Sequence, residues 1–157
     1  MMRTIALRFS NNFAPKEGTI RAHQELIQKN GFVWYGKLGS RISARVKDVI
    51  LLNEDPMILL IHSGSFDRYW AHIVSIQNET PPADDIPAYY RDRAEDFATW
   101  FKVQRFEEAP RNILSQCFVA SSGASLSSVS RYSMNPYFIV DYIEPKADRR
   151  STMNEST

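Results

Sequence analysis

The chain has 157 residues, of which 43% are hydrophobic and 24% are charged, and these proportions fit one domain with a single hydrophobic core. The formal net charge of +1 excludes proteins that coat nucleic acid through an overall positive field, so any nucleic-acid site must be local. One cysteine excludes an internal disulfide framework, and with three scattered histidines it does not supply a structural zinc cluster. We therefore expect no metal and no cofactor.

The start of the chain and its hydropathy bear on location. Arg3 and Arg8 interrupt a short alternating run, which is not the pattern of a signal peptide. No apolar run approaches the length that spans a membrane. We therefore predict a cytoplasmic protein that does not contact a membrane.

The first elements are a strand and an amphipathic helix. Residues 3–9 alternate apolar and other side chains, which predicts a strand with one buried face. Residues 19–30 have helical spacing, with Thr19 expected as the N-cap and Gly31 as the stop.

A second strand and a second helix follow. Residues 32–36, "FVWYG", have strand composition. Residues 43–53, "SARVKDVILLN", predict a helix capped by Ser43 and ended by the Asp55-Pro56 pair.

The middle of the chain is the most strongly β. Residues 57–63 and 68–77 predict a hairpin across the turn "GSFD". Residues 78–96 contain three prolines and several acids, so we expect a long connection with one helical turn from Pro87. Residues 99–108 return to alternation and predict another strand.

The C-terminal third predicts a helical turn, a strand and a final strand. Residues 109–123 lead from a short helical turn into a strand, and "YFIVDYI" at 137–143 closes the fold. Residues 146–157 lack apolar periodicity, so we expect one domain over 1–145 and a flexible tail.

These elements predict the α+β class. The links between the middle strands are too short for parallel crossovers, which favours a mixed, mainly antiparallel sheet curled into a small β-barrel, with two or three peripheral helices. A doubly wound fold is less favoured. The loop "GKLGSR" is not a phosphate-binding fingerprint, because its Gly-Lys pair is not followed by Ser or Thr.

The order of these features resembles a known superfamily. The segments "WYGKLGS", "ILLIHSGSFDRYWAHIVSI", "PAYYRDR", "TWFKVQRFE" and "SSGASLSSVSRYSMNPYFIV" together resemble small barrels of the PUA-like superfamily, especially its EVE and YTH branches. This resemblance implies binding of DNA or RNA, with a modified or flipped base held in an aromatic pocket. It suggests a cage chosen from Trp34, Trp70, Tyr90 and Trp100.

The pair Trp34 and Tyr35 stands directly before a glycine-rich loop with Lys37 and Arg41. Aromatic faces stack on bases, and glycines allow a phosphate to approach the two cations. On this hypothesis, Trp34→Ala lowers affinity and leaves the fold intact. The alternative interpretation is a core strand that ends in a solvated turn.

Two further segments carry suitable chemistry. The segment "YYRDR" joins Tyr89 and Tyr90 to Arg91 and Arg93, which suits stacking with phosphate contacts, although the arginines can instead pair with neighbouring carboxylates. Ser121 and Ser122 offer hydroxyls and amides to a phosphate or a base edge, or serve only in a turn.

The prediction is therefore a non-catalytic nucleic-acid-binding module that recognises a base. One alternative is a small interaction or defence-related protein that binds a protein partner or a soluble nucleotide, since aromatic residues and arginine also favour protein interfaces. A second alternative is a nuclease or hydrolase that uses His62, with Ser63 and Asp67 nearby. His23, His72 and Cys117 are interpreted as structural.

Overall fold

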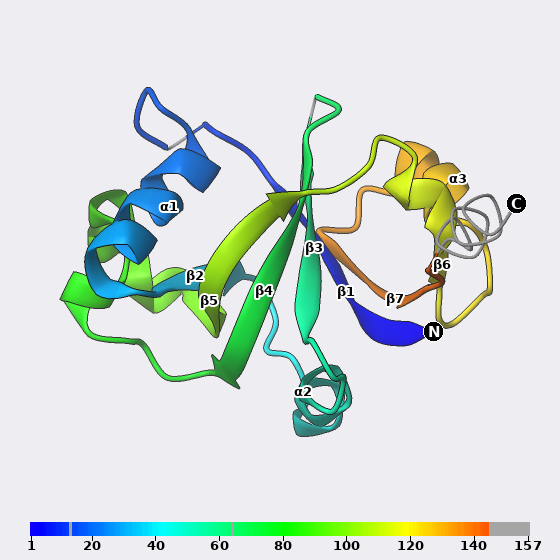
Figure 1. Cartoon of the computed structure of the whole chain (residues 1–157), viewed down its shortest axis with the longest axis horizontal. Helices are drawn as coiled ribbons and strands as arrows, with labels where there is room; N and C mark the ends of the chain where they lie inside the picture. Colours follow the sequence, from blue (N-terminus) through cyan, green and yellow to red (C-terminus); the bar gives the residue numbers. More distant parts are fainter. Residues whose placement is uncertain (13, 64, 145–157) are drawn as a thin grey trace, which may run out of the picture.

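The computed structural model of the chain describes residues 1–12, 14–63 and 65–144. Its strands form one seven-stranded sheet in the order β2-β5-β4-β3-β1-β7-β6 (Figure 1). The strands are β1 (Met2–Phe9), β2 (Val33–Leu38), β3 (Met57–His62), β4 (Arg68–Gln77), β5 (Phe97–Glu108), β6 (Cys117–Val119) and β7 (Tyr137–Tyr142). Among the described pairings only β1 with β3 is parallel, so the predicted mixed, mainly antiparallel sheet is confirmed.

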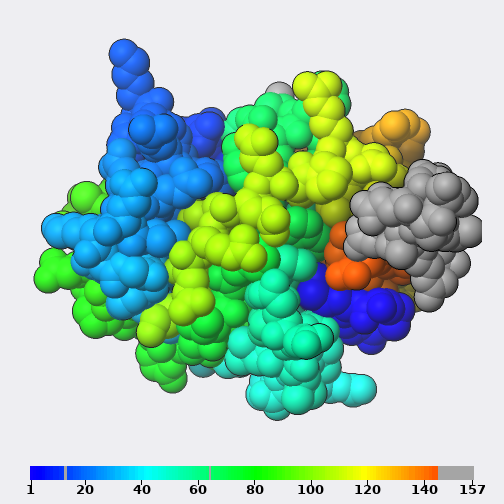
Figure 2. All heavy atoms as spheres, viewed as in Figure 1, coloured from blue at the N-terminus to red at the C-terminus, as the bar shows by residue number. Residues whose placement is uncertain are grey.

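Helices lie around the sheet and complete the predicted α+β class. They are α1 (Thr19–Asn30), α2 (Ala44–Leu51), α3 (Leu126–Tyr132) and the 3-10 helices η1 (Ala83–Asp85), η2 (Ala88–Asp96) and η3 (Ile113–Gln116). Helix α1 contacts β2 and β5, α2 contacts β1, and α3 contacts β6 at the opposite end (Figure 1). Figure 2 shows α1, β5 and α2 covering one face of the molecule. No described helix is long and apolar enough to cross a membrane.

The sheet curls around its main hydrophobic core. Leu7 of β1 and Tyr35 of β2 belong to the same buried cluster, together with Leu60, Ile73 and Phe101 from the three strands between them. Strands at separate positions in the sheet therefore face one another across the core, as in a small barrel. β1 and β2 are not paired with each other in the described part of the chain, and we call the gap between the end of β1 and β2 the seam.

A second core covers the outer side of the same strands. Ala6, Leu59 and Trp70 pack there against Leu126 and Phe138. The prediction that β1 buries only one face is therefore wrong. Ile5 and Leu7 face the main core whereas Ala6 packs in the second core, so both faces of β1 are covered.

The helix caps agree with the sequence in two of three places. Ser43 Oγ accepts a hydrogen bond from Val46 N at 3.2 Å, and Gly31 ends α1 in the left-handed conformation. Thr19 is not the N-cap of α1. Gly18 occupies that position, and the side chain of Asn11 accepts the hydrogen bond of Thr19 N at 2.9 Å. The predicted tail at 146–157 lies outside the described residues.

Candidate functional site

A cavity of about 260 Å³ opens at the seam between β1 and β2. Residues 7–10 at the end of β1, residues 35–38 of β2 and three side chains of η2 line it, together with Thr19, Phe97 and Pro136 among others. We call this cavity the seam pocket. The mouth of a small barrel is a common place for ligand sites, and this volume lies just below their usual range of roughly 300–1,000 Å³. It therefore suits a single planar group.

Aromatic rings form much of its wall. Tyr90 lies between Tyr89 and Phe97, with ring centroids 4.7 and 4.6 Å apart respectively. Behind them, Trp100 lies 5.0 Å from Phe97 and is fully buried. Tyr35 and Phe9 complete the aromatic lining. The rings that line the pocket are thus held in place by a layer of rings that does not reach it.

Gly36 lets this wall form. A Cβ atom at Gly36 would lie 2.7 Å from Cδ1 and 2.8 Å from Cγ of Phe97, and 3.0 Å from Cζ3 of Trp100. The Phe97 ring therefore lies directly on the backbone of β2, at a distance that no side chain at position 36 would allow.

Lys37 brings a buried positive charge to the pocket. Its ammonium donates to the carbonyls of Leu38 at 3.1 Å and Ser40 at 2.7 Å, and lies 4.2 Å from the ring centroid of Tyr137. Burial lowers the pKa of Lys37. Among the described residues that line the pocket, none is Asp or Glu, so this charge has no carboxylate to neutralise it there.

Two arginines line the same pocket. Arg8 donates from Nε to Asn135 O at 3.0 Å and from Nη2 to Ser130 O and Ser133 O, each at 2.9 Å, and so fixes the segment before β7. Arg93 Nε lies 3.7 Å from the Asp96 carboxylate. The pocket therefore combines three cationic side chains with aromatic walls.

The tyrosyl hydroxyls stay protonated at neutral pH. Burial raises the pKa of Tyr35 and Tyr89, and raises that of Tyr90 well above its usual value. Tyr35 and Tyr90 surround His23, with ring centroids 5.0 and 5.2 Å away, and burial lowers the pKa of this histidine to about 4. His23 Nδ1 donates to Thr19 O at 2.8 Å. Neutral phenols can donate to or accept from the edge of a ligand.

Five of the residues proposed from sequence meet at the seam pocket: Tyr35, Lys37, Tyr89, Tyr90 and Arg93. Trp34 and Trp100 pack together with Tyr90 behind the wall, on the outer side of β2 and β5, and are 7% and 0% exposed. Trp34 and Tyr35 point to opposite faces because side chains alternate along a strand.

Trp70 and the remaining candidates lie elsewhere. Trp70 belongs to the second core, 5.0 Å from the Tyr142 ring, so the four residues of the proposed cage do not gather in one slot. Arg41 is exposed, and Arg91 Nε donates to Ala83 O at 2.9 Å. Neither of these arginines belongs to the described lining of the seam pocket.

Ser121 and Ser122, which were also proposed from sequence, are exposed at a turn. Ser122 Oγ accepts a hydrogen bond from Ala124 N at 3.2 Å, as expected of a turn residue. Ser121 lines a separate cavity between α2 and β7.

Sequence reasoning missed Arg8 and Phe97 as pocket residues. Arg8 gave a signal, since it is the charged residue near the C-terminal end of β1. Phe97 gave no signal, because its place depends on the pairing of β2 with β5.

The geometry does not support the alternative of a nuclease or hydrolase that uses His62. His62 Nδ1 lies 2.6 Å from the hydroxyl of Ser65, not Ser63, and Ser65 donates to Asp67 at 3.2 Å. The carboxylate thus contacts the serine and does not orient the histidine, which is not the arrangement of a nucleophile and its base. The described residues contain no group of three or more His, Cys, Asp or Glu side chains suited to a metal ion.

Comparison with protein-family models gives a match over most of the chain. The model of a family described as Pua-like matches residues 5–153, nearly the whole chain. No curated protein and no solved structure gives a significant match.

Proposed function

Because this chain belongs to the Pua-like family, in which nucleic-acid binding is the general function, we propose that it is a non-catalytic nucleic-acid-binding module that holds one base in the seam pocket. The finer assignment, recognition of a modified or flipped base as in the EVE and YTH branches, is part of this proposal.

One observation carries the proposal: the seam pocket joins stacked aromatic walls to a buried ammonium, with no carboxylate among its described lining residues. Every nucleobase has a π-face, so an aromatic slot accepts bases, and each stacked base contributes roughly 1–3 kcal/mol. A cation beside the slot attracts the phosphate that accompanies the base.

The wall also offers a way to distinguish bases. The hydroxyls of Tyr35 and Tyr90 stay neutral at physiological pH because burial raises their pKa. They can therefore donate or accept at the edge of a base that is turned out of its stack. A methyl group on the base would add apolar area against the ring of Phe97.

The test measures fluorescence anisotropy of short labelled DNA and RNA oligonucleotides, unmodified and with methylated or hydroxymethylated bases, at two salt concentrations. Phe97→Ala should lower affinity roughly 5- to 150-fold, which is the loss of one stacked base. Lys37→Met should reduce the slope of log affinity against log salt by about 0.7 for a single strand. Lys29→Met is the matched control, since Lys29 is exposed on α1 and outside the described lining of the cavities.

Each alternative gives a different result. Binding of a protein partner, with no oligonucleotide affinity and little effect of salt, would replace the nucleic-acid function by an interaction function. Tight binding of mononucleotides with no gain from a longer strand would indicate a soluble nucleotide as the ligand. Affinity that Phe97→Ala leaves unchanged would place the base elsewhere. A preference for one modified base would support the EVE-like and YTH-like assignment.

A further inference from the structure

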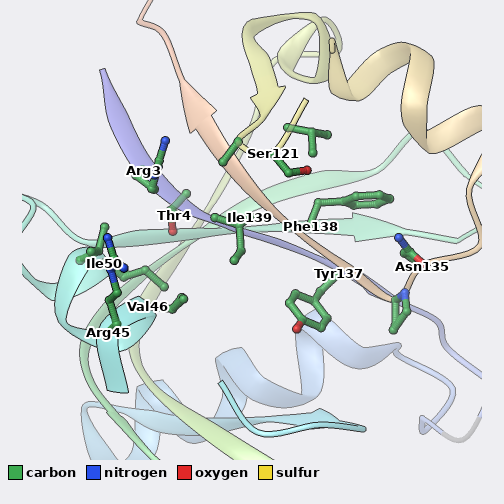
Figure 3. Close-up of a pocket in the computed structure, with 14 residues that line it drawn as sticks. Arg3, Thr4, Arg45, Val46, Ile50, Ser121, Asn135, Tyr137, Phe138 and Ile139 are labelled. Carbon is green, nitrogen blue, oxygen red and sulfur yellow. The ribbon is translucent and has the colours of Figure 1, made fainter. Parts of the chain in front are cut away.

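A second cavity, of about 640 Å³, lies between α2 and β7. We call it the α2–β7 pocket. Figure 3 shows Tyr137 and Ile139 on the same side of β7, toward Arg45 and Val46 of α2, whereas Phe138 points to the other side. This follows from the alternation of side chains along a strand. One face of α2 and side chains of β7 therefore form part of the cavity wall, and Arg3, Thr4 and residues 119–121 complete it.

The two pockets are neighbours with a shared boundary. Pro136 lines both of them. Tyr137 lines the α2–β7 pocket, and its ring lies 4.2 Å from the ammonium of Lys37, which lines the seam pocket. The contact between the Tyr137 ring and the Lys37 ammonium thus lies between the two pockets.

The α2–β7 pocket has an apolar floor and a positive rim. Val46, Ile50 and Ile139 contribute apolar surface. Arg45 is exposed and forms no ion pair with any described residue. Arg3 also lines the pocket, but its Nε lies 2.8 Å from the Asp141 carboxylate, so its charge is largely neutralised.

The positive rim of the pocket points to an anionic ligand, and its apolar floor points to a ligand with a flat apolar body. No Asp or Glu occurs among the described residues that line either pocket. A nucleotide meets both requirements, since its base can lie on aliphatic and aromatic surface while its phosphate meets Arg45.

We propose that the α2–β7 pocket is a subsite for the nucleotide next to the one in the seam pocket, on the same strand; this rests on the proposed function. The shared boundary favours one strand over two unrelated ligands, because neighbouring nucleotides of one chain would have only Pro136 and the Tyr137–Lys37 contact between them. The preferred ligand is then an unpaired segment of at least two nucleotides, since both bases must leave any duplex to enter the pockets.

The test compares two probes: a nucleoside monophosphate, and a seven-nucleotide single strand with the same base at its centre. Two variants act on the second pocket alone. Arg45→Gln removes its unpaired charge, and Ala120→Leu adds volume to its lining. Arg111→Gln is the matched control, because Arg111 is exposed and outside the described lining of the cavities. Urea unfolding of each variant verifies that the fold is retained.

The expected result is a loss of about 5- to 10-fold in affinity for the seven-nucleotide strand in both variants, with the monophosphate unaffected. Phe97→Ala should weaken both probes. If Arg45→Gln and Ala120→Leu leave the strand unaffected while Phe97→Ala weakens both probes, the second subsite is wrong and the proposed function stands. If the two variants weaken both probes equally, the pockets are not separate subsites and the inference is wrong. If the unmodified protein binds neither probe, both proposals are overturned.

Discussion

Replacing Gly36 by alanine tests the contact that shapes the seam pocket. The added Cβ would lie 2.7 Å from Cδ1 and 2.8 Å from Cγ of Phe97, and 3.0 Å from Trp100 Cζ3. Real Cβ contacts are longer, so the Phe97 ring must move. Since Trp100 is fully buried behind it and Phe97 lines the pocket, we expect the ring to shift into the pocket.

Two opposing effects set the magnitude. Overpacking of this kind costs about 1–3 kcal/mol of stability. Gly36 is not among the described glycines with positive φ, so alanine meets no backbone strain there and gains about 0.4–1 kcal/mol by restricting the unfolded chain. The net loss should therefore lie between about 0 and 2.6 kcal/mol, with a central value of about 1.3 kcal/mol.

A double-mutant cycle with Phe97→Ala isolates the contact. Urea unfolding gives the free energy of unfolding of the wild type, both single variants and the double variant. Without the Phe97 ring, the two closest contacts disappear, so Gly36→Ala should then cost close to nothing. Anisotropy should show weaker oligonucleotide binding by Gly36→Ala itself. An equal cost of Gly36→Ala in both backgrounds would refute this account of the pocket wall.

Three further predictions concern buried or anchored groups. Burial lowers the pKa of His23 from 6.5 to about 4. Between these two pH values the unfolded state binds a proton that the folded state does not. The free energy of unfolding should therefore fall by about 3 kcal/mol as pH drops from 6.5 to 4. The difference in unfolding free energy between wild type and His23→Gln should change across this range, and parallel curves would contradict it. Burial raises the pKa of the Cys117 thiol to about 12, so a thiol-reactive dye at pH 8 should label it only in urea; prompt labelling of the folded protein would contradict its burial. Arg8→Met should lower the free energy of unfolding by about 2 kcal/mol, because it removes three hydrogen bonds to carbonyls. Arg8→Lys should restore only part of this stability, because an ammonium lacks the guanidinium fork. Full rescue by lysine would show that charge alone suffices.

Local patterns in the sequence predicted most elements of the fold. A nearly continuous apolar run and the turn that follows it located the hairpin of β3 and β4, because consecutive residues of both strands are buried. Ser43 and Gly31 marked helix ends through chemistry that acts within a few residues. Asn11 shows the limit of such signals. Its side chain accepts the hydrogen bond of Thr19 N, eight residues later, across a loop whose path the sequence does not specify.

The order of strands in the sheet was not available from local patterns. Ala6 has a small side chain that suits an exposed or a covered face equally well. It is fully buried because α3 and β7 reach the outer side of β1, which requires contacts more than 100 residues apart in the chain. Alternation alone therefore could not show that β1 lies in the interior of the sheet.

The sequence predicted which segments form the candidate site better than it predicted which residues line it. The segments around Tyr35 and Tyr90 do meet at one pocket. Which ring of each aromatic pair reaches the pocket depends on the direction in which the sheet curls. The sequence shows that Trp34 and Tyr35 point to opposite faces, but it does not show which face borders the seam.

Trp34 illustrates the consequence for experiments. The burial of Trp34 argues against the expectation that Trp34→Ala leaves the fold intact. Its side chain is only 7% exposed and packs with Trp100 and Ile86. Truncating a buried tryptophan costs about 3–5 kcal/mol, a large part of the total stability of most small domains. Urea unfolding should show this loss, and Trp34→Phe should recover most of it. Weaker binding by Trp34→Ala would then report a disturbed wall behind Tyr90 and not a lost stacking partner. If Trp34→Ala instead kept wild-type stability and lost affinity, Trp34 would contact the ligand directly, and the base would lie on the outer side of β2.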